Sequence, residues 1–153
     1  STGEFIWAKK FGLSYGCIPM GVKIDQHSNI YIAGTFEDSI DLDPGPQIDF
    51  HFVGHDQGIF IVKLDSAGNY VWGKVLSSPW WLSVIGMGID SQNNVYLSGN
   101  YASTVDWDPG PGVFNRNSPR NTNSAWGNGY VLKLDRNGNV QWVYELKLLS
   151  FIE

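Results

Sequence analysis

Apolar residues alternate with small or polar residues over several short stretches of the chain. The pattern is clearest at residues 29–36 (Asn-Ile-Tyr-Ile-Ala-Gly-Thr-Phe), and a period of two is typical of a half-buried strand. Further stretches at 22–25, 58–65 and 69–76 predict three more strands. Between the last two, residues 65–68 (Asp-Ser-Ala-Gly) indicate a hairpin, because Asp opens a turn with its side chain and Gly takes positive φ. Eighteen glycines and no long stretch at helical spacing predict an all-β chain.

The four-strand pattern is repeated along the chain. Residues 41–46 (Asp-Leu-Asp-Pro-Gly-Pro) return as 106–111 (Asp-Trp-Asp-Pro-Gly-Pro), 65 positions later. Later positions match at an offset of 70, so five residues are inserted in the second unit between Pro111 and Tyr130. A partial copy precedes both units, since residues 3–7 (Gly-Glu-Phe-Ile-Trp) match the beginning of the last strand in each unit.

Repeat units of four strands are typical of the blades of a β-propeller. We therefore expect a single propeller segment over residues 1–153. Its parts are the last strand of a preceding blade at 3–11, a first blade at 18–76, a second blade at 83–146 and a divergent tail at 147–153. Two blades leave an apolar face bare at each end. The sequence thus predicts a partial ring that is completed by a longer parent chain or by oligomerisation.

The linked motifs resemble a known family. The motifs are Gly-Asn-x-x-Trp, Asn-x-Tyr-x-x-Gly-x-aromatic, Asp-x-Asp-Pro-Gly-Pro and Lys-Leu-Asp. With them, the chain from Gly3 to about Leu146 resembles the SBBP repeats, which are named for a seven-bladed β-propeller. The resemblance implies a secreted or cell-surface bacterial protein that serves extracellular display or binding. It supplies no catalytic residues.

Charge and composition exclude several classes of function. The net charge is −5 with only ten scattered basic residues, which argues against nucleic acid as a partner. No apolar run approaches the ~20 residues of a membrane span. Cys17 stands alone, so it forms no internal disulfide, leaves the compartment undecided and is expected to be a small buried residue.

The Asp-x-Asp-Pro-Gly-Pro segments are the candidate metal sites. Asp41 and Asp43, and likewise Asp106 and Asp108, are two residues apart, so in an extended segment their carboxylates project to one side. They would bind calcium with the help of backbone carbonyls. The alternative, which we favour, is that these side chains cap backbone amides of a tight turn. No other cofactor is expected.

Aromatic residues provide candidate partner contacts. Trp7, Trp72 and Trp142 share one position of the repeated last strand, which predicts packing between neighbouring blades. Other aromatic residues belong to links and loops, where they can stack on a sugar or anchor a protein partner. These candidate contacts are Tyr15, Trp80, Trp81 and Trp126. For Trp80 and Trp81 the alternative, which we favour, is packing between blades.

No catalytic motif is recognisable. Cys17 has no base at a motif spacing, and no serine lies in a nucleophile-elbow pattern. His51 and His55 lie too far apart in an extended strand to share a metal ion without a bend. The leading hypothesis is a non-enzymatic scaffold for protein or glycan binding. The alternatives are a glycan-active enzyme, hydrolase or lyase, with acidic residues of separate blades on one rim, and a calcium-stabilised structural repeat.

Overall fold

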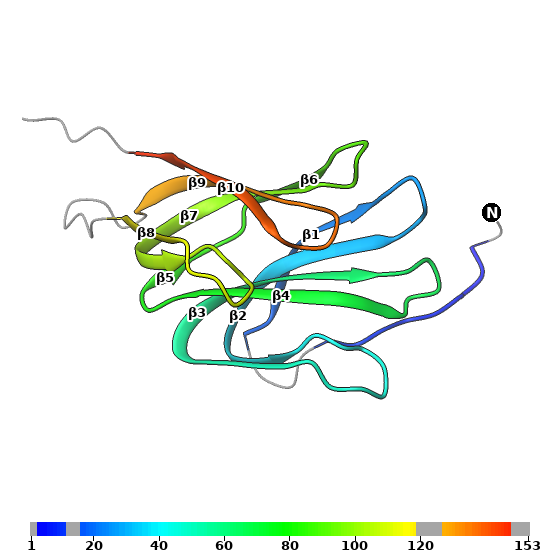
Figure 1. Ribbon diagram of the computed structural model, residues 1–153. Helices are drawn as coiled ribbons and strands as arrows, with labels where there is room; N and C mark the ends of the chain where they lie inside the picture. Colours follow the sequence, from blue (N-terminus) through cyan, green and yellow to red (C-terminus); the bar gives the residue numbers. More distant parts are fainter. Residues whose placement is uncertain (1–2, 12–15, 119–126, 148–153) are drawn as a thin grey trace, which may run out of the picture.

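The computed structural model describes residues 3–11, 16–118 and 127–147. These residues form ten strands and no helix, so the all-β prediction is confirmed. The first four strands form one antiparallel sheet in chain order (Figure 1). They are β1 (Ile18–Ile24), β2 (Ile30–Asp41), β3 (Phe50–Leu64) and β4 (Tyr70–Ser78).

The second sheet repeats this order with its first strand broken in two. β5 and β6 both pair with β7, so together they take the place that β1 has in the first sheet. β8 pairs with the end of β7, as the beginning of β3 pairs with the end of β2. Equivalent pairings are offset by 65 positions at β8 and by 70 at β9, so the five inserted residues lie between these two strands in the sequence. The bounds are β5 (Trp81–Leu82), β6 (Gly86–Ile89), β7 (Val95–Asp106), β8 (Asn115–Ser118), β9 (Asn128–Leu134) and β10 (Val140–Leu146).

The second and third strands of the first sheet are longer than the sequence predicts. β2 continues beyond Phe36 to Asp41, and β3 begins at Phe50 rather than near Gly58. Pairing continues through register shifts next to Asp38, which has a positive φ of 65°. A β-bulge of this kind bends a hairpin without ending it. The Asp-x-Asp-Pro-Gly-Pro segment therefore closes a long, bent hairpin.

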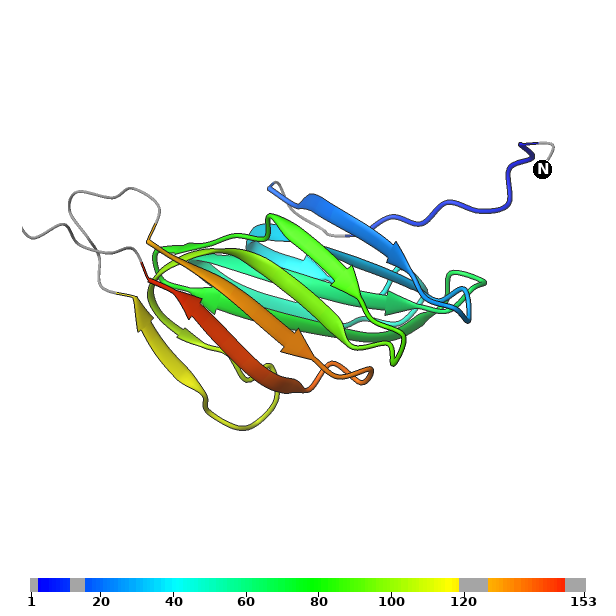
Figure 2. The same ribbon diagram turned by 90° about the horizontal axis from the view of Figure 1, so that it is seen from above.

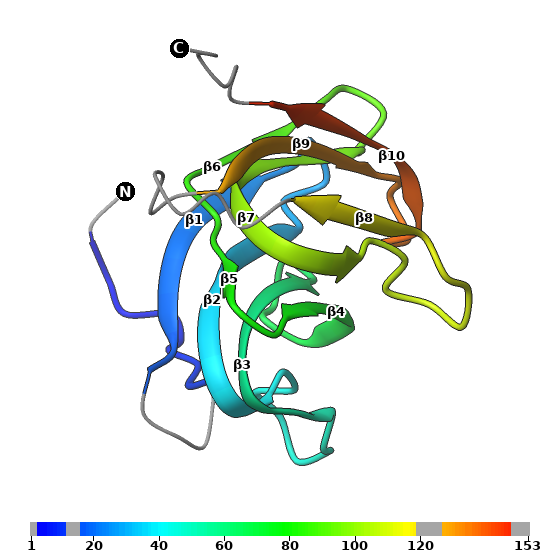
Figure 3. The same ribbon diagram turned by 90° about the vertical axis from the view of Figure 1, so that its left-hand side faces the viewer.

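The two sheets pack face to face, with β4 against β7 and β1 against β6 (Figures 1 and 3). Side chains from both sheets form one buried cluster between them. It includes Tyr31, Ile59 and Ile61 of the first sheet and Val95, Leu97, Tyr101, Tyr130, Leu132 and Leu134 of the second. Such an arrangement of antiparallel four-strand units is that of neighbouring propeller blades.

The first sheet is apolar on both faces. Because side chains alternate along a strand, Ile59 and Ile61 of β3 face the second sheet, whereas Phe60 and Val62 face the other way. We call this second group the outer cluster. It consists of Phe36, Ile40, Leu42, Phe60, Val62 and Leu64. A sheet with two apolar faces is built to lie between two neighbours.

Residues 3–11 extend from the end of the molecule where the tight turns lie (Figures 1 and 2). They are described without strand pairing. Phe11 nevertheless packs against the outer cluster. The assignment of this segment to a preceding blade stays a prediction. Among the described residues, no helix is long and apolar enough to cross a membrane.

Candidate functional site

Four turns of one design close the hairpins at one end of the molecule. In the first, the Asp25 carboxylate accepts hydrogen bonds from the backbone N–H groups of His27 and Asn29, both at 2.9 Å, and from Asn29 Nδ2, also at 2.9 Å. The turns that begin at Asp65, Asp90 and Asp135 repeat these three bonds with their own residues. The fourth position has positive φ in each turn. It is occupied by Ser28, Gly68, Asn93 and Gly138.

These hydrogen bonds hold the turn carboxylates in their charged form. The side-chain bond from Asn94 is the main cause that lowers the pKa of Asp90 to about 2, and Tyr96 Oη adds a bond of 3.0 Å. For Asp25, burial alone would raise the pKa, but the bonds from Asn29, His27 and Tyr31 outweigh it and lower the pKa. The turn aspartates therefore stabilise local structure at neutral pH.

The two Asp-x-Asp-Pro-Gly-Pro loops also have equivalent geometry. Asp41 Oδ1 accepts hydrogen bonds from the backbone of Asp43 at 3.1 Å and of Asp49 at 3.0 Å, and Asp43 Oδ1 accepts one from Gly45 at 2.7 Å. In the second blade, Asp106 and Asp108 accept the corresponding bonds at 2.7–3.1 Å.

The four candidate metal ligands thus cap backbone amides, as the favoured alternative predicts. Across the described part of the chain, no group of three or more His, Cys, Asp or Glu side chains is placed to hold a metal ion. Calcium binding at Asp41, Asp43, Asp106 and Asp108 stays a prediction.

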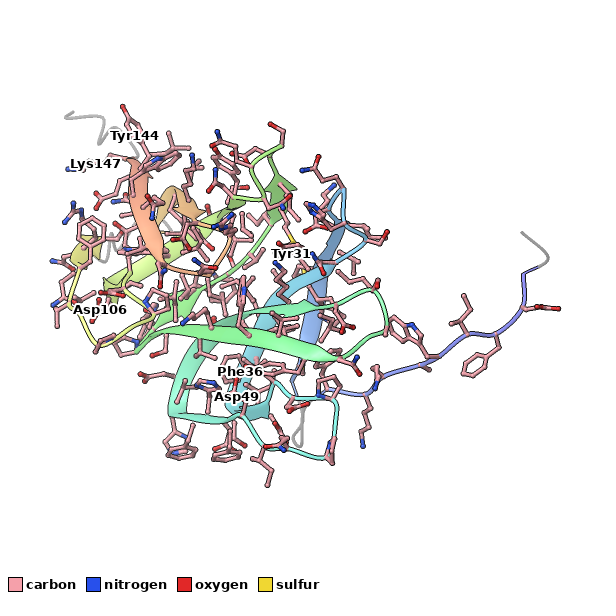
Figure 4. All side chains as sticks on the ribbon, turned by 45° about the vertical axis from the view of Figure 1, so that its right-hand side comes forward. Tyr31, Phe36, Asp49, Asp106, Tyr144 and Lys147 are labelled. Carbon is pink, nitrogen blue, oxygen red and sulfur yellow. The ribbon has the colours of Figure 1, made fainter. Side chains whose placement is uncertain are left out.

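The first loop carries a polar cluster that sequence reasoning missed. The Tyr70 hydroxyl donates a hydrogen bond to Asp49, and His51 Nε2 lies 3.1 Å from the other oxygen of Asp49. Burial, followed by this bond, raises the pKa of Tyr70. The cluster borders a pocket of about 490 Å³ with a mixed polar and apolar lining. Its counterparts in the second blade are Phe114 and Val140, so comparison of the repeats gives no signal for it. Figure 4 shows Asp49 on this first loop and Asp106 on the second.

The four candidate aromatic contacts do not form one site in the described structure. Tyr15 and Trp126 lie outside the described residues. Trp80 is exposed in the link between the sheets, and Trp81 of β5 is half-buried opposite Ala102. Trp81 lines a largely apolar pocket of about 370 Å³ between the beginning of β1 and β5. We call it the junction pocket. Exposed Ile18, Met20 and Ile85 form its apolar rim.

Trp72 lies between the blades, as the sequence predicts. Its ring meets Tyr31 edge-on, with centroids 6.1 Å apart, and its Nε1 donates a 3.2 Å hydrogen bond to the Arg136 carbonyl in the last turn of the second blade. A Cβ added at Gly138 of the same turn would lie 3.0 Å from the Lys74 side chain and 3.2 Å from the Trp72 ring. Glycine therefore permits the side chains of β4 to approach the neighbouring turn closely.

Comparisons with known proteins add one distant relative. Over 119 residues, 69% of this chain, the sequence is 27% identical to an uncharacterized WD repeat-containing protein of Acanthamoeba polyphaga mimivirus, and the match spans 9% of that protein. No protein-family model matches the chain, and no solved structure matches it. The SBBP assignment and a bacterial source therefore stay predictions, and the relative is viral. Two packed antiparallel sheets and similarity to a WD repeat-containing protein together support a β-propeller-like repeat architecture.

Proposed function

We propose that this chain is a non-enzymatic β-propeller scaffold that binds a protein partner at the junction pocket. The observation that carries the proposal is the pocket itself, which is about 370 Å³ in volume, largely apolar and located where the two sheets meet. Pockets of this size with few polar groups are typical binding sites. The relative's printed description as WD repeat-containing supports a repeat scaffold.

The lining of the junction pocket favours an apolar side chain as its occupant. Ile18 and Met20 come from β1, and Ile85 lies in the link between β5 and β6, so segments of both sheets present apolar side chains to solvent around one cavity. Glu37 and Gln57 supply polar groups at the same site. An apolar anchor in a pocket with a polar rim is the usual form of a protein-binding hot spot.

The acidic residues favour a scaffold over a glycan-active enzyme. The aspartates of both Asp-x-Asp-Pro-Gly-Pro loops accept hydrogen bonds from amides of their own loops. Their arrangement is that of structural caps. A secreted or cell-surface location in bacteria is part of the proposal and rests on the resemblance to SBBP repeats. Glycan stacking on exposed Trp80 is the other form of partner binding that the sequence suggests.

Selection from a displayed peptide library, together with a glycan array, tests this function. We expect selected peptides with an apolar anchor residue, whose affinity falls at least about tenfold in Met20→Glu, since a buried charge in an apolar pocket is costly. Ile48→Glu is the matched control, because Ile48 is exposed on the loop after Asp43, away from the junction pocket. If the array finds a glycan whose binding is lost in Trp80→Ala, the partner is a glycan and not a protein. Peptides that bind Met20→Glu as well as the unmodified chain would overturn the proposal.

A further inference from the structure

The contact between the two blades has a donor side and a receiving side. The donor side is the face of β4 that carries Trp72 and Leu76, and both side chains pack into the cluster between the sheets. The receiving side is the face of the second sheet with the turn at Gly138 and with Met87 and Ile89 of β6. Trp72 bridges the two sides through its bond to Arg136.

The outer face of the second blade repeats the donor side. Trp142 of β10 meets the Tyr96 ring edge-on at 6.1 Å, which matches the Trp72–Tyr31 distance. Trp142 is 41% exposed. Leu146, the counterpart of Leu76, is 56% exposed, whereas Leu76 is 3% exposed. Figure 4 shows Tyr144, which lies between them on β10, at the edge of the molecule. This face therefore makes the Trp142–Tyr96 contact within its own blade, but among the described residues no further blade packs against it.

The outer face of the first blade repeats the receiving side. Val22 and Ile24 of β1 are the counterparts of Met87 and Ile89, and they are exposed. The turn at Gly68 corresponds to the turn at Gly138 and has the same hydrogen bonds. The exposed donor face and the exposed β1 edge of the receiving face thus carry the same kinds of residues that already pack together inside the chain. The middle of the receiving face is the outer cluster, which is buried, with Phe11 packed against it.

The N-terminal segment occupies part of the receiving face. A Cβ added at Gly68 would lie 3.1 Å from the Trp7 ring, so Trp7 lies on this turn as Trp72 lies on the turn at Gly138. Trp7 and Phe11 hold the segment to this face, but it has no strand pairing in the described structure, and its Phe5 and Ile6 side chains are 82% and 84% exposed. A firmer donor strand is therefore expected to displace it.

We propose that the β10 face of one copy docks on the β1–β2 face of a second copy, with Trp142 replacing Trp7 over Gly68. The pairing is head to tail, so it leaves one free face on each end of the assembly and continues into a ring or an open array. A second copy is the occupant because its blade 1 carries the turn and the apolar side chains that the internal contact uses. This association is independent of the junction pocket.

Sedimentation velocity over a range of concentrations tests the proposal. The unmodified chain is expected to rise above its monomer mass of 17.1 kDa as concentration increases. Trp142→Ala on the donor face and Ile24→Glu on the receiving face should each weaken association about tenfold or more. Both side chains are exposed, so loss of folding is not expected, and thermal melting checks it. Trp80→Ala is the control for removal of an exposed indole and should associate normally.

Two further measurements are specific to this geometry. Trp7→Ala should strengthen association about threefold or more, because the competing indole is removed. A mixture of Trp142→Ala and Ile24→Glu keeps one intact face of each kind and should form a heterodimer that stops at about twice the monomer mass. A chain that stays at 17.1 kDa at high concentration, or a mixture of the two variants that stays monomeric, would overturn the proposal.

Discussion

Gly99 of β7 is expected to be a position where one methyl group strongly destabilises the fold. A Cβ added there would lie 1.8 Å from the Ser83 carbonyl oxygen and 2.8 Å from its carbon. That carbonyl is held in place, since Tyr130 Oη donates a 2.9 Å hydrogen bond to it. The first blade has the same close approach, with 2.3 Å between a Cβ at Gly34 and the Ile18 oxygen. Both glycines therefore let the first strand of a blade cross close to the second.

The expected cost of Gly99→Ala is the sum of two effects. To relieve the clash, the β5–β6 backbone has to move away from β7 by more than an ångström. Such a movement is a form of overpacking, which costs about 1–3 kcal/mol. Loss of the Tyr130 bond to Ser83 adds about 1 kcal/mol. A total of about 2–4 kcal/mol lowers the melting temperature by about 5–15 °C for a chain of this size.

Thermal unfolding followed by circular dichroism and tryptophan fluorescence measures this loss. Gly88→Ala is the matched control, because a Cβ at Gly88 of β6 would meet nothing nearer than Tyr96 Cβ at 4.0 Å. It should be neutral or stabilise by up to about 1 kcal/mol, since alanine restricts the unfolded chain. A Gly99→Ala variant that melts within about 2 °C of the unmodified chain would refute the reasoning.

Three further predictions concern titratable and metal-binding groups. Folding lowers the pKa of Asp90 from its usual value near 4 to about 2. The stability that its turn contributes is therefore complete above pH ~4 and is lost as pH falls toward ~2. Over this pH range the melting temperature of the unmodified chain should fall more steeply than that of Asp90→Asn. Burial raises the pKa of the Cys17 thiol, so a thiol reagent near pH 8 should modify the native chain more slowly than the unfolded chain. Equal rates of modification would contradict the packing of Cys17 against the outer cluster. Calcium at the Asp-x-Asp-Pro-Gly-Pro loops would raise the melting temperature relative to chelator, whereas equal midpoints would remove the calcium prediction.

Local structure was the most predictable part of the protein. The hairpin turn that begins at Asp65 could be identified from its residues, because each of its hydrogen bonds joins groups two to four positions apart. The polar cluster of Asp49 and Tyr70 could not be found in this way. These two residues are 21 positions apart, and the second blade has apolar residues at both places.

The sequence by itself determined the all-β class, the repeat of four strands and the capping of turns by aspartate, because each follows from contacts between near neighbours and from the alternation of side chains. Only the tertiary structure decided which face of the first sheet meets the second. Ile61 and Val62 are equally apolar neighbours on β3, and alternation sends them to opposite faces without saying which face is covered. The bond from Trp72 to Arg136 and the junction pocket also depend on how two sheets pack, since they join residues 60 or more positions apart.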